Sequence, residues 1–514
     1  MKIAFAQEMR MIDKAAIELY GIPEIVLMEN AGYETAVAVE KMLGDLSGKK
    51  VCVLAGTGNN GGDAFAAVRH MANRGAKIKV FLMGEAGHLT SSARINFNVV
   101  VNMGITVHSV VLQRDWDKAQ VALGFSDVVI DGLLGTGYKG QLRENMEKMI
   151  DLVNDAKKPV VAIDLPSGVN ADTGAVFSRA VNAQRTISFG LPKMGQLFYP
   201  GAKYVGELLI DDIGIPGELL EDRKIQQELI DFKYAKKNFV KRAPDVHKGN
   251  CGKVLVIAGS RGLTGAAALS SMAALRSGTG VVTLAIAESL HNIMECKLTE
   301  VMTRPVPEVE NGIMGETALP VLLELAKQYD TVVIGPGLGR HKSTMKLVRE
   351  FVAQAECPIV VDADAIYAYC NEDGDLKKAK KILVLTPHMG EMARFLQVSV
   401  SELKESLVES TCKAARKYHA VFVLKSEKTI VVYPNGSVFV TTRGNSGMAT
   451  AGSGDVLAGT IGGLIAQGFG DKGAVAGVFL HGFAGDIAAK NGMNGLIASD
   501  IITALPAARF AIGE

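Results

Sequence analysis

Residues 451–468 read AGSGDVLAGTIGGLIAQG, and the Gly-Ser-Gly-Asp at 452–455 is the most informative feature of the chain. The small residues leave backbone N–H groups free to approach an anion, and the apolar run that follows predicts a buried helix beginning here. The free N–H groups and the dipole of a helix N-terminus attract phosphate. Asp455 in this position either caps the helix or acts as a base, and in a lone motif of this kind it is more often a cap.

A second glycine-rich turn, AGTGNNGGDA, occupies residues 55–64. It follows the apolar run 51–54, which predicts a buried strand, and precedes 65–71, whose spacing predicts a helix. Strand, glycine-rich turn and helix form the context of a nucleotide-binding loop. The glycine spacing differs from the GxGxxG dinucleotide pattern. The two asparagines and the aspartate nevertheless offer hydrogen bonds and oxygen ligands for a polar head group or a hard cation.

Three acidic residues, Asp63, Asp131 and Asp164, lie at or just beyond the ends of predicted strands. Ligands of open parallel sheets bind beyond the carboxyl ends of the strands, so these carboxylates should converge. Each aspartate taken singly could equally cap a helix or fix a turn, but together with Asn59, Asn60 and Ser167 they favour a site. Oxygen ligands of low total charge suit a monovalent or alkaline-earth cation better than zinc.

The elements that must position these residues alternate along two halves of the chain. The charged, proline-containing stretch 215–250 separates the halves, and its basic run is interpreted as a solvated face. Strands that alternate with helices indicate parallel sheets covered on both faces. We expect strands near 51–54, 78–82, 127–131, 159–164 and 185–189, and then near 253–258, 281–286, 331–334, 358–362, 382–385, 421–424 and 429–433.

Composition narrows the class of protein. A chain of 514 residues with 48% hydrophobic and 21% charged residues is an ordinary globular protein of two to four domains. A net charge of +1 argues against a nucleic-acid partner. No signal core or membrane-spanning run is evident, so we expect a soluble, cytoplasmic protein. Its scattered cysteines are interpreted as free thiols in a reducing compartment rather than as disulfides or zinc ligands: Cys52, Cys251, Cys296, Cys357, Cys370 and Cys412.

Longer motifs of the first half occur in a fixed order: LMENAG (27–32), GNNGGD (58–63), DGLLGTG (131–137), DLPSGVNADTG (164–174) and TISFGLPKMG (186–195). This order resembles the N-terminal domain of the bifunctional NAD(P)H-hydrate repair enzymes, the NAD(P)H-hydrate epimerase. The resemblance implies a Rossmann-like domain that interconverts the R and S epimers of hydrated NADH and NADPH.

The resemblance also implies roles for individual residues. Asp164 is the acid/base candidate, because inverting the hydroxyl-bearing carbon C6 needs loss and return of its oxygen. Asn60, Asp131 and Ser167 match the potassium (K⁺) ligands of the family. Ala64 stands where the family usually has glycine, and the loop tolerates it only if that residue is not left-handed. The hydrated dinucleotide is expected to contact Asn59, Asn60, Gly61, Gly62, Asp63, Gly135, Thr136, Gly137, Tyr138, Lys139, Gly140, Gln141 and Asp164.

The second half carries its own ordered motifs: HKGNCGKVLVIAGS (247–260), LTGAAALS (263–270), GPGLG (335–339), IVVDADAI (359–366), LTPHMGEMARF (385–395), VLKSEKTIV (423–431) and GNSGMATAGSGDVLAG (444–459). They resemble the ADP- or ATP-dependent NAD(P)H-hydrate dehydratase, which is a ribokinase-like domain. The implied reaction is a phosphoryl-assisted elimination. The stretch from Asn445 to Gly454 would hold the terminal phosphate, and Asp455 would take the proton of the hydrate's hydroxyl, which attacks phosphorus. Such a transfer implies ADP or ATP with Mg²⁺.

By the same resemblance, Ala266, Gly337, His388 and Asp455 line the hydrated-dinucleotide site. The adenine nucleotide is expected to contact Lys425, Ser426, Glu427, Lys428, Thr429 and Gly454. Ser426 stands where the family often has glycine. His388 could instead cap a helix or be a buried histidine, although its loop position favours function. Asp362 and Asp364 could contact substrate, support a metal or fix a turn.

We therefore predict an α/β chain with a Rossmann-like epimerase domain over 1–215, a linker over 216–246 and a ribokinase-like dehydratase domain over 247–514. We expect a homo-oligomer that binds hydrated NADH or NADPH and adenine nucleotide, with no nucleic acid and no membrane partner. One alternative is a ribokinase-like kinase of a vitamin alcohol, fused to a nicotinamide-nucleotide-binding module. A stable phosphorylated product would distinguish that kinase from a dehydratase.

Overall fold

The computed structural model describes residues 1–239, 241–370 and 376–513. Backbone contacts divide the chain into a first unit, Lys2–Ile225, and a second unit, Gln226–Glu514 together with Met1. The division falls inside the segment 216–246 that was predicted as a linker. Within that segment lie helix α8 (Gly217–Leu220), strand β8 (Gln227–Ile230) and helix α9 (Phe232–Asn238).

The first unit is built on a seven-stranded sheet in the order β3-β2-β1-β4-β5-β6-β7, with every neighbouring pair parallel. This order begins 3-2-1-4-5-6, the doubly wound pattern, so the Rossmann-like prediction is confirmed. The strands β3 and β7 were not predicted, because they are half-exposed edge strands without a buried apolar run. The strands are β1 (Lys50–Ala55), β2 (Lys77–Leu82), β3 (Val107–Ser109), β4 (Val128–Gly132), β5 (Val160–Ile163), β6 (Arg185–Phe189) and β7 (Glu207–Asp211).

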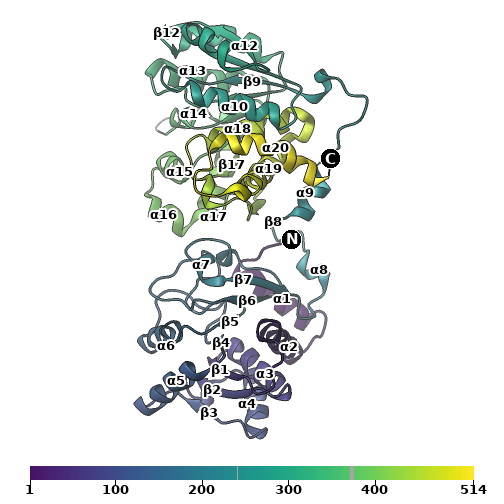
Figure 1. The fold of residues 1–514 in the computed structure, drawn as a ribbon, viewed down its shortest axis with the longest axis vertical. Coiled ribbons are helices and arrows are strands. Elements are labelled where there is room, and N and C mark those ends of the chain that lie inside the picture. The colour runs from purple at the N-terminus through teal and green to yellow at the C-terminus, as the bar shows by residue number, and fades with distance from the viewer. Residues whose placement is uncertain (240, 371–375, 514) are drawn as a thin grey trace. The chain divides into compact units, whose positions relative to one another are not determined.

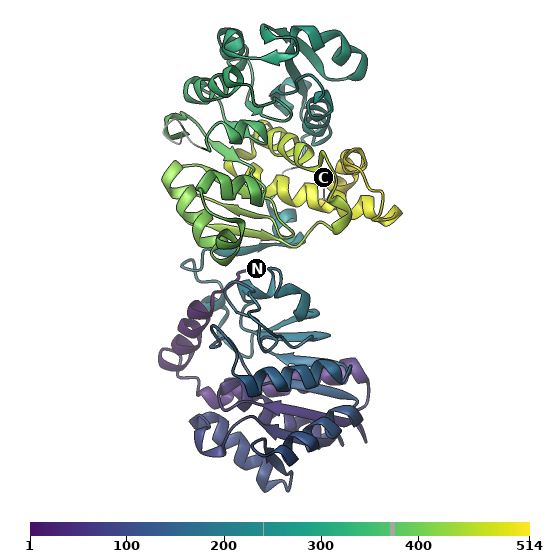
Figure 2. The same cartoon turned by 90° about the vertical axis from the view of Figure 1, so that its left-hand side faces the viewer.

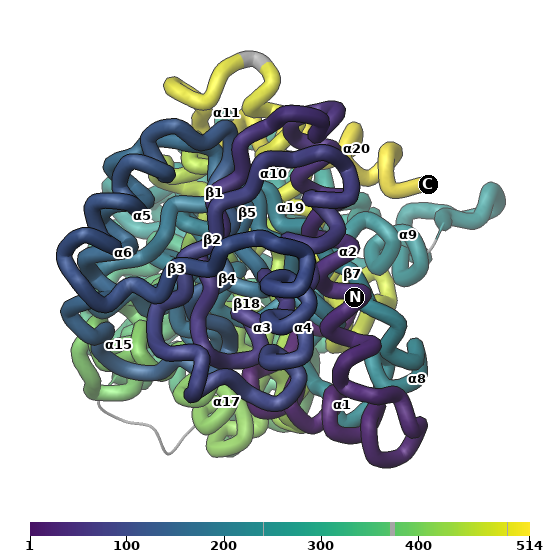
Figure 3. The backbone as a smooth tube through the Cα atoms, turned by 90° about the horizontal axis from the view of Figure 1, so that it is seen from below, coloured from purple at the N-terminus to yellow at the C-terminus, as the bar shows by residue number. Residues whose placement is uncertain are grey.

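Helices cover both faces of this sheet, as Figures 1 and 3 show. Val51 and Val53 of β1 pack on the side of α2, α3 and α4, whereas Cys52 and Leu54 pack on the side of α5 and α6. The alternation follows from the two-residue period of a strand. The helices are α1 (Ala6–Glu18), α2 (Glu24–Leu43), α3 (Asn59–Asn73), α4 (Ser91–Asn102), α5 (Gln113–Phe125), α6 (Glu144–Asp155) and α7 (Ala202–Val205).

The second unit contains a ten-stranded sheet in the order β11-β10-β9-β14-β15-β16-β17-β18-β19-β8. The pairs β17–β18 and β18–β19 are antiparallel, which differs from the predicted parallel sheet. The reason is local, since the short connection 425–429 can form a hairpin but not a parallel crossover. Besides β8, the strands are β9 (Lys253–Ile257), β10 (Val281–Ala287), β11 (Met302–Val306), β14 (Thr331–Ile334), β15 (Ile359–Val361), β16 (Leu383–Leu385), β17 (Val421–Leu424), β18 (Ile430–Val432) and β19 (Val438–Thr441). The pair β12 (Glu308–Glu310) and β13 (Ile313–Met314) forms a separate ribbon.

Helices flank this sheet too, as Figures 1 and 2 show. The predicted helix at 453 is confirmed as α18, and it packs closely on α10, where a Cβ added at Gly459 would lie 2.0 Å from the carbonyl oxygen of Ser270. The helices are α10 (Thr264–Arg276), α11 (His291–Lys297), α12 (Leu319–Ala326), α13 (Lys342–Gln354), α14 (Asp364–Tyr367), α15 (Met389–Leu396), α16 (Val400–Glu405), α17 (Leu407–Tyr418), α18 (Ser453–Leu464), α19 (Gly473–Ala488) and α20 (Ala498–Ile512).

Candidate functional sites

A cavity of about 780 Å³ lies beyond the carboxyl ends of the central strands of the first unit. It is large enough for a small-molecule ligand. The predicted residues that line it are Asn59, Asn60, Asp63, Gly135, Thr136, Gly137, Tyr138, Lys139, Gln141 and Asp164. Gly140 does not line the cavity. Gly61 and Gly62 are buried beneath its wall, where a Cβ on Gly61 would lie 1.9 Å from the carbonyl oxygen of Gly56.

The stretch Asn59–Asp63, predicted as a loop, is instead the beginning of α3. Gly58 precedes the helix, and no side chain of the described residues caps it. A helix start of this kind leaves N–H groups free for an anion, so the change from loop to helix keeps the expected chemistry. Ala64 lies inside α3 and is fully buried, so its backbone is helical rather than left-handed and the departure from glycine causes no strain.

Asn60, Asp131 and Ser167 meet around the backbone of Leu134. The hydroxyl of Ser167 donates to Asp131 Oδ1 at 2.6 Å and accepts a hydrogen bond from the N–H of Leu134 at 2.9 Å. Asn60 Nδ2 donates to the carbonyl of Leu134 at 3.0 Å. Burial raises the pKa of Asp131 to about 6, against the hydrogen bonds from Ser167 and Leu133 that lower it. The three side chains therefore hold the turn after β4, and they also gather carboxylate, hydroxyl and carbonyl oxygens in one place.

Asp164 pairs with Lys193, a partner that was not singled out from the sequence. The Lys193 side chain is 1% exposed, and its ammonium contacts Asp164 Oδ1. It also donates to the carbonyl of Phe189 at 2.8 Å and to Ser188 Oγ at 3.1 Å. The backbone of Asp164 has φ 61°, a left-handed conformation that is uncommon outside glycine and typical of functional sites. The ion pair thus fixes a carboxylate in the cavity wall.

Three further carboxyl groups line the same cavity, Asp13 from α1, Glu24 from the start of α2 and Asp63 from α3. Burial raises the pKa of Asp13 to about 6, with Lys193 opposing and Asp164 adding to the shift. Burial also raises the pKa of Asp63 well above its usual value, with Asp164 and Asp13 contributing. The cavity therefore combines a lysine-paired carboxylate with carboxyl groups that hold their protons toward neutral pH.

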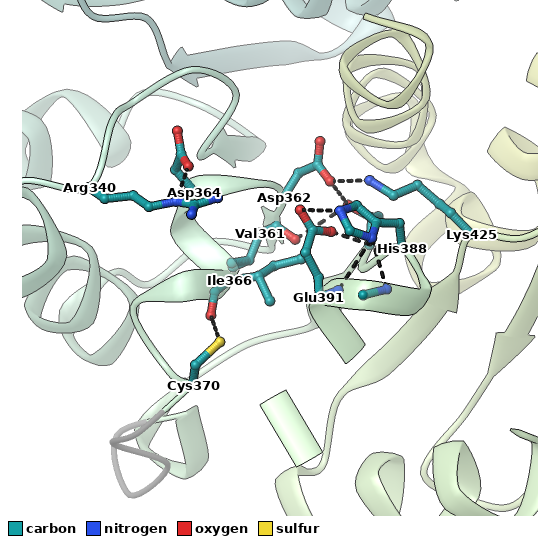
Figure 4. Close-up of polar contacts among 11 residues, drawn as sticks. Arg340, Val361, Asp362, Asp364, Ile366, Cys370, His388, Glu391 and Lys425 are labelled. Atoms are coloured by element: carbon teal, nitrogen blue, oxygen red, sulfur yellow. Dashed lines mark hydrogen bonds and ion pairs between the residues drawn. The ribbon is translucent and has the colours of Figure 1, made fainter. Parts of the chain in front are cut away.

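In the second unit, a buried ion pair joins Asp362, just after β15, to Lys425, just after β17 (Figure 4). Lys425 Nζ lies 2.7 Å from Asp362 Oδ1, and the carboxylate is 1% exposed. Burial opposes the charge on Lys425, but neighbouring carboxylates led by Asp362 outweigh it and raise the pKa of Lys425. A Cβ added at Gly454 would lie 3.1 Å from Nζ, so the ammonium sits against the first turn of α18.

Asp455 lies in that first turn and does not cap the helix. Gly452 occupies the N-cap position, and no side chain of the described residues caps α18. Burial raises the pKa of Asp455 to about 7, with Asp362 adding to the shift and Lys425 opposing it. The free N–H groups suit a phosphate, and a carboxyl group titrating near neutral pH suits a base.

His388 caps α15, as the alternative interpretation held. Its Nδ1 accepts from the N–H groups of Gly390 at 3.0 Å and Glu391 at 3.3 Å, while Glu391 Oε2 accepts from the His388 N–H at 2.8 Å. An accepting Nδ1 places the proton of the neutral ring on Nε2. The side chain is 58% exposed, and its Nε2 lies 3.4 Å from Glu391 Oε1, so the imidazole faces solvent beside a carboxylate. An isolated parallel β-bridge pairs His388 with Lys425, so the backbones of these two residues lie side by side.

The remaining predicted residues of the second unit surround this cluster. A Cβ on Gly337 would lie 3.0 Å from Ala266 Cβ, and Leu269, one turn further along α10, lies against Gly452. Lys425–Thr429 form the β17–β18 hairpin, in which Ser426 Oγ donates to the carbonyl of Lys428 at 2.8 Å and Glu427 is exposed. Ser426 keeps a negative φ, so its hydroxyl closes the hairpin without backbone strain.

Asp364 is committed to a turn. Its Oδ2 accepts from the N–H of Gly339 at 3.0 Å, and its Oδ1 pairs with Arg340 at 2.9 Å. Its carboxylate therefore fixes the loop after β14.

In the described part of the chain, no group of three or more His, Cys, Asp or Glu side chains is placed to hold a metal ion. The six cysteines are free, and no helix among the described residues is long and apolar enough to cross a membrane.

Two site residues that were not predicted, Lys193 and Asp13, each carry a signal in the sequence. Lys193 lies inside TISFGLPKMG, a motif that already carried the resemblance. Asp13 interrupts the buried face of α1 formed by Met9, Ile12 and Ala16, and an acidic residue on an apolar face signals a special environment. Neither signal, however, indicates which charged partner each residue meets.

The fold and the sites define a nucleotide-binding α/β enzyme of two units, each with a lysine–aspartate pair beyond its parallel strands. Residues 24–195 match the family described as YjeF-related protein N-terminus, and residues 254–507 match NAD(P)H-hydrate dehydratase. The bifunctional NAD(P)H-hydrate repair enzyme Nnr of Moorella thermoacetica is 40% identical over 98% of this chain and 96% of its own length. The Escherichia coli protein of the same name is 31% identical over 98% and 92%.

The chain therefore belongs to the family of bifunctional NAD(P)H-hydrate repair enzymes. The Thermofilum pendens member is likewise 40% identical, over 100% of this chain and 97% of its own length. Among solved structures, a Bacillus subtilis ADP/ATP-dependent NAD(P)H-hydrate dehydratase crystallised with ATP and Mg²⁺ is 27% identical over 55% of this chain and 98% of its own length, with a TM-score of 0.49.

The Lys193–Asp164 pair gives a test that separates chemistry from folding. Lys193→Met leaves the Asp164 carboxylate, which is 15% exposed, without its ammonium, so we expect the free energy of unfolding of the first unit to fall by less than the roughly 3–5 kcal/mol typical of a fully buried charge. Epimer interconversion should slow by roughly 10²-fold or more, measured by chromatography of the two epimers. The double variant Lys193→Met, Asp164→Asn should recover stability but not interconversion. Exposed Lys203→Met serves as the control. If Asp164→Asn interconverts the epimers at the wild-type rate, Asp164 is not the acid/base and the ion pair has only a structural role.

Proposed function

We propose that the protein repairs hydrated NADH and NADPH, with the first unit interconverting the R and S hydrates and the second unit dehydrating the S hydrate. ADP or ATP drives the second reaction. The observation that carries this proposal is the cluster of Asp455, Lys425 and Asp362 at the uncapped start of α18. The full-length similarity to repair enzymes supports dehydration over the vitamin-kinase alternative.

The dehydration proceeds in two chemical steps. Asp455 takes the proton from the hydroxyl on C6 of the hydrate, and that oxygen attacks the terminal phosphorus, converting ATP into ADP or ADP into AMP. The C6–O bond then breaks, phosphate leaves, and loss of a C5 proton to water restores the double bond of the dihydropyridine. The N–H groups at the start of α18 and the Lys425 ammonium would stabilise charge on the transferred phosphoryl group.

The epimerisation uses acid–base chemistry without a nucleotide. A protonated carboxyl group of the cavity donates to the hydroxyl on C6, and water leaves as the ring nitrogen stabilises the resulting cation. Water then returns from the opposite face and gives up a proton to a carboxylate. Asp164, held by Lys193 in the cavity wall, is the proposed acid/base, and its charge would stabilise a cation bound there. Asp13 and Asp63 are the proton-bearing neighbours.

Two metal ions fit these sites differently. For K⁺ we propose the site of Asn60, Asp131 and Ser167, because the carboxylate, the hydroxyl and the Leu134 carbonyl to which Asn60 donates offer oxygens with one formal charge, a balance that suits a weakly charged ion. A Mg²⁺ ion would supply charge neutralisation on the phosphates. It would be held mainly by the phosphates themselves, since the described residues offer no dedicated cage of acidic side chains. We further propose a cytoplasmic homo-oligomer, for which the free thiols fit a reducing compartment.

Substitution of Asp455 tests the dehydratase assignment. Asp455→Asn keeps the size of the side chain but removes the base, so nucleotide-dependent formation of NADH should fall by about 10²–10⁴-fold. In the wild type, dehydration should rise as pH increases through about 7, because Asp455 must lose its proton to act. Epimer interconversion by the same preparation reports that the chain is folded. Dehydration at the wild-type rate in Asp455→Asn would show that another group is the base.

Replacement of potassium tests the cation site. At constant ionic strength, exchange of KCl for choline chloride should slow epimer interconversion and leave dehydration of the S hydrate unchanged. Asp131→Ala should loosen the turns of the cavity, weaken binding of the hydrate and abolish the response to K⁺. Asp155→Ala, at an exposed position, is the matched control. An Asp131→Ala protein with an undiminished K⁺ response would remove the ion from these three residues.

A further inference from the structure

Asp362 is a buried carboxylate with an unusual pattern of hydrogen bonds (Figure 4). Both of its donors meet the same oxygen: Lys425 Nζ lies 2.7 Å and Thr386 Oγ1 lies 2.6 Å from Oδ1. The other oxygen, Oδ2, is buried and has no hydrogen-bond partner in the described part of the chain. An unpartnered buried oxygen is costly, so its presence in a packed site calls for a function. Because no donor of the described residues reaches Oδ2, the negative charge of the carboxylate is compensated less than it would be with hydrogen bonds to both oxygens.

Lys425 is held at both ends, by a hydrogen bond of its backbone N–H and by the ion pair of its ammonium. The backbone N–H of Lys425 donates to the carbonyl of Pro387 at 2.8 Å, which anchors the end of β17. At the other end of the side chain, the ammonium lies between Asp362 and the first turn of α18, close to Gly454. A free lysine side chain loses much rotamer entropy when it is placed, and the ion pair supplies that ordering before any ligand arrives.

Charged groups from several elements face Asp455. Asp362 follows β15, Asp364 begins α14, Glu391 lies on α15, and Lys425 follows β17. His481 of α19 lies 3.5 Å from Ser453 Oγ in the same turn, and burial lowers its pKa to about 4, so it is neutral. Arg340 pairs with Asp364, and His388 lies beside Glu391. Among the carboxylates, Asp362 contributes most to the raised pKa of Asp455.

We propose that Asp362 is a positioning residue for the dehydratase reaction, with two effects. Its carboxylate lies 2.7 Å from the Lys425 ammonium and holds it at the start of α18, where the transferred phosphoryl group would lie. Because that ammonium packs on Gly454, the same ion pair also places a negative and a positive charge beside the neighbouring base, Asp455. This inference rests on the proposed dehydratase function. It assigns Asp362 a role distinct from fixing a turn, which is the role of Asp364.

The test compares pH profiles of kcat for ATP-dependent dehydration of the S hydrate by the full chain. Asp362→Asn removes a negative neighbour, so the acid limb set by Asp455 should move to lower pH by roughly one unit. The value of kcat at the optimum should fall at least tenfold, because Lys425 loses its anchor. Lys425→Met removes a positive neighbour, so its acid limb should move to higher pH. Opposite shifts from two members of one ion pair are not expected from a general loss of packing.

Thr386→Val is the matched control, since it removes the other hydrogen bond to Oδ1 but keeps the charge of Asp362. Its acid limb should stay at the wild-type pH. An acid limb that does not move in Asp362→Asn, or wild-type kcat in that variant, would overturn the positioning role. If Asp362→Asn fails to fold, as judged by its thermal unfolding, an unmoved limb in Lys425→Met overturns the role by itself. A wild-type chain that forms no NADH overturns the proposed function and this inference together.

Discussion

A buried lysine–aspartate pair beyond the carboxyl ends of parallel strands is the interaction on which both sites depend. In the first unit Lys193 holds Asp164, and in the second Asp362 holds Lys425. In each pair the more deeply buried member is 1% exposed, so loss of its partner would leave a charge in a poorly solvated place. The pairs are therefore weak evidence for stability. Their value lies in fixing the position of a charge.

The same pairs set the protonation of their neighbours. Asp13 and Asp63 lie beside Asp164, and Asp455 lies beside Asp362, so each neighbour feels both burial and a nearby negative charge. The result is carboxyl groups that titrate toward neutral pH next to ion-paired groups. Acid–base chemistry near pH 7 needs this combination, because an ordinary aspartate would be a weak base and would carry no proton to donate.

Patterns local in the sequence predicted much of the fold and of the site. The apolar runs located the central strands of both sheets, and the Gly-Ser-Gly-Asp stretch located the start of α18. The stretch 59–63 was predicted as a loop because it lies in a glycine-rich turn between a predicted strand and a predicted helix. It forms the first turn of α3, in which Gly61 lies so close to Gly56 that a Cβ would be 1.9 Å from its carbonyl oxygen. Tertiary context overrides propensity at such a position.

Long-range charge pairs could not be predicted in this way. Lys425 and Asp362 are 63 positions apart, and Lys193 and Asp164 are 29 apart. A single sequence gives each residue's type but not its partner, and a lysine in a family motif is equally consistent with contact to a phosphate. The antiparallel edge of the second sheet was missed for a related reason. Hairpin or crossover depends on the short connection 425–429 rather than on the strands themselves.

The most direct test of the account follows the absorbance of reduced nicotinamide when the full chain meets mixed epimers of hydrated NADH. Without nucleotide, the absorbance should stay unchanged while the epimers interconvert. With ATP, both epimers should be converted completely into NADH, the R form at the rate set by the first unit, with one phosphate released for each NADH formed. A phosphorylated dinucleotide that accumulates while the absorbance stays flat would contradict the account and identify the second unit as a kinase.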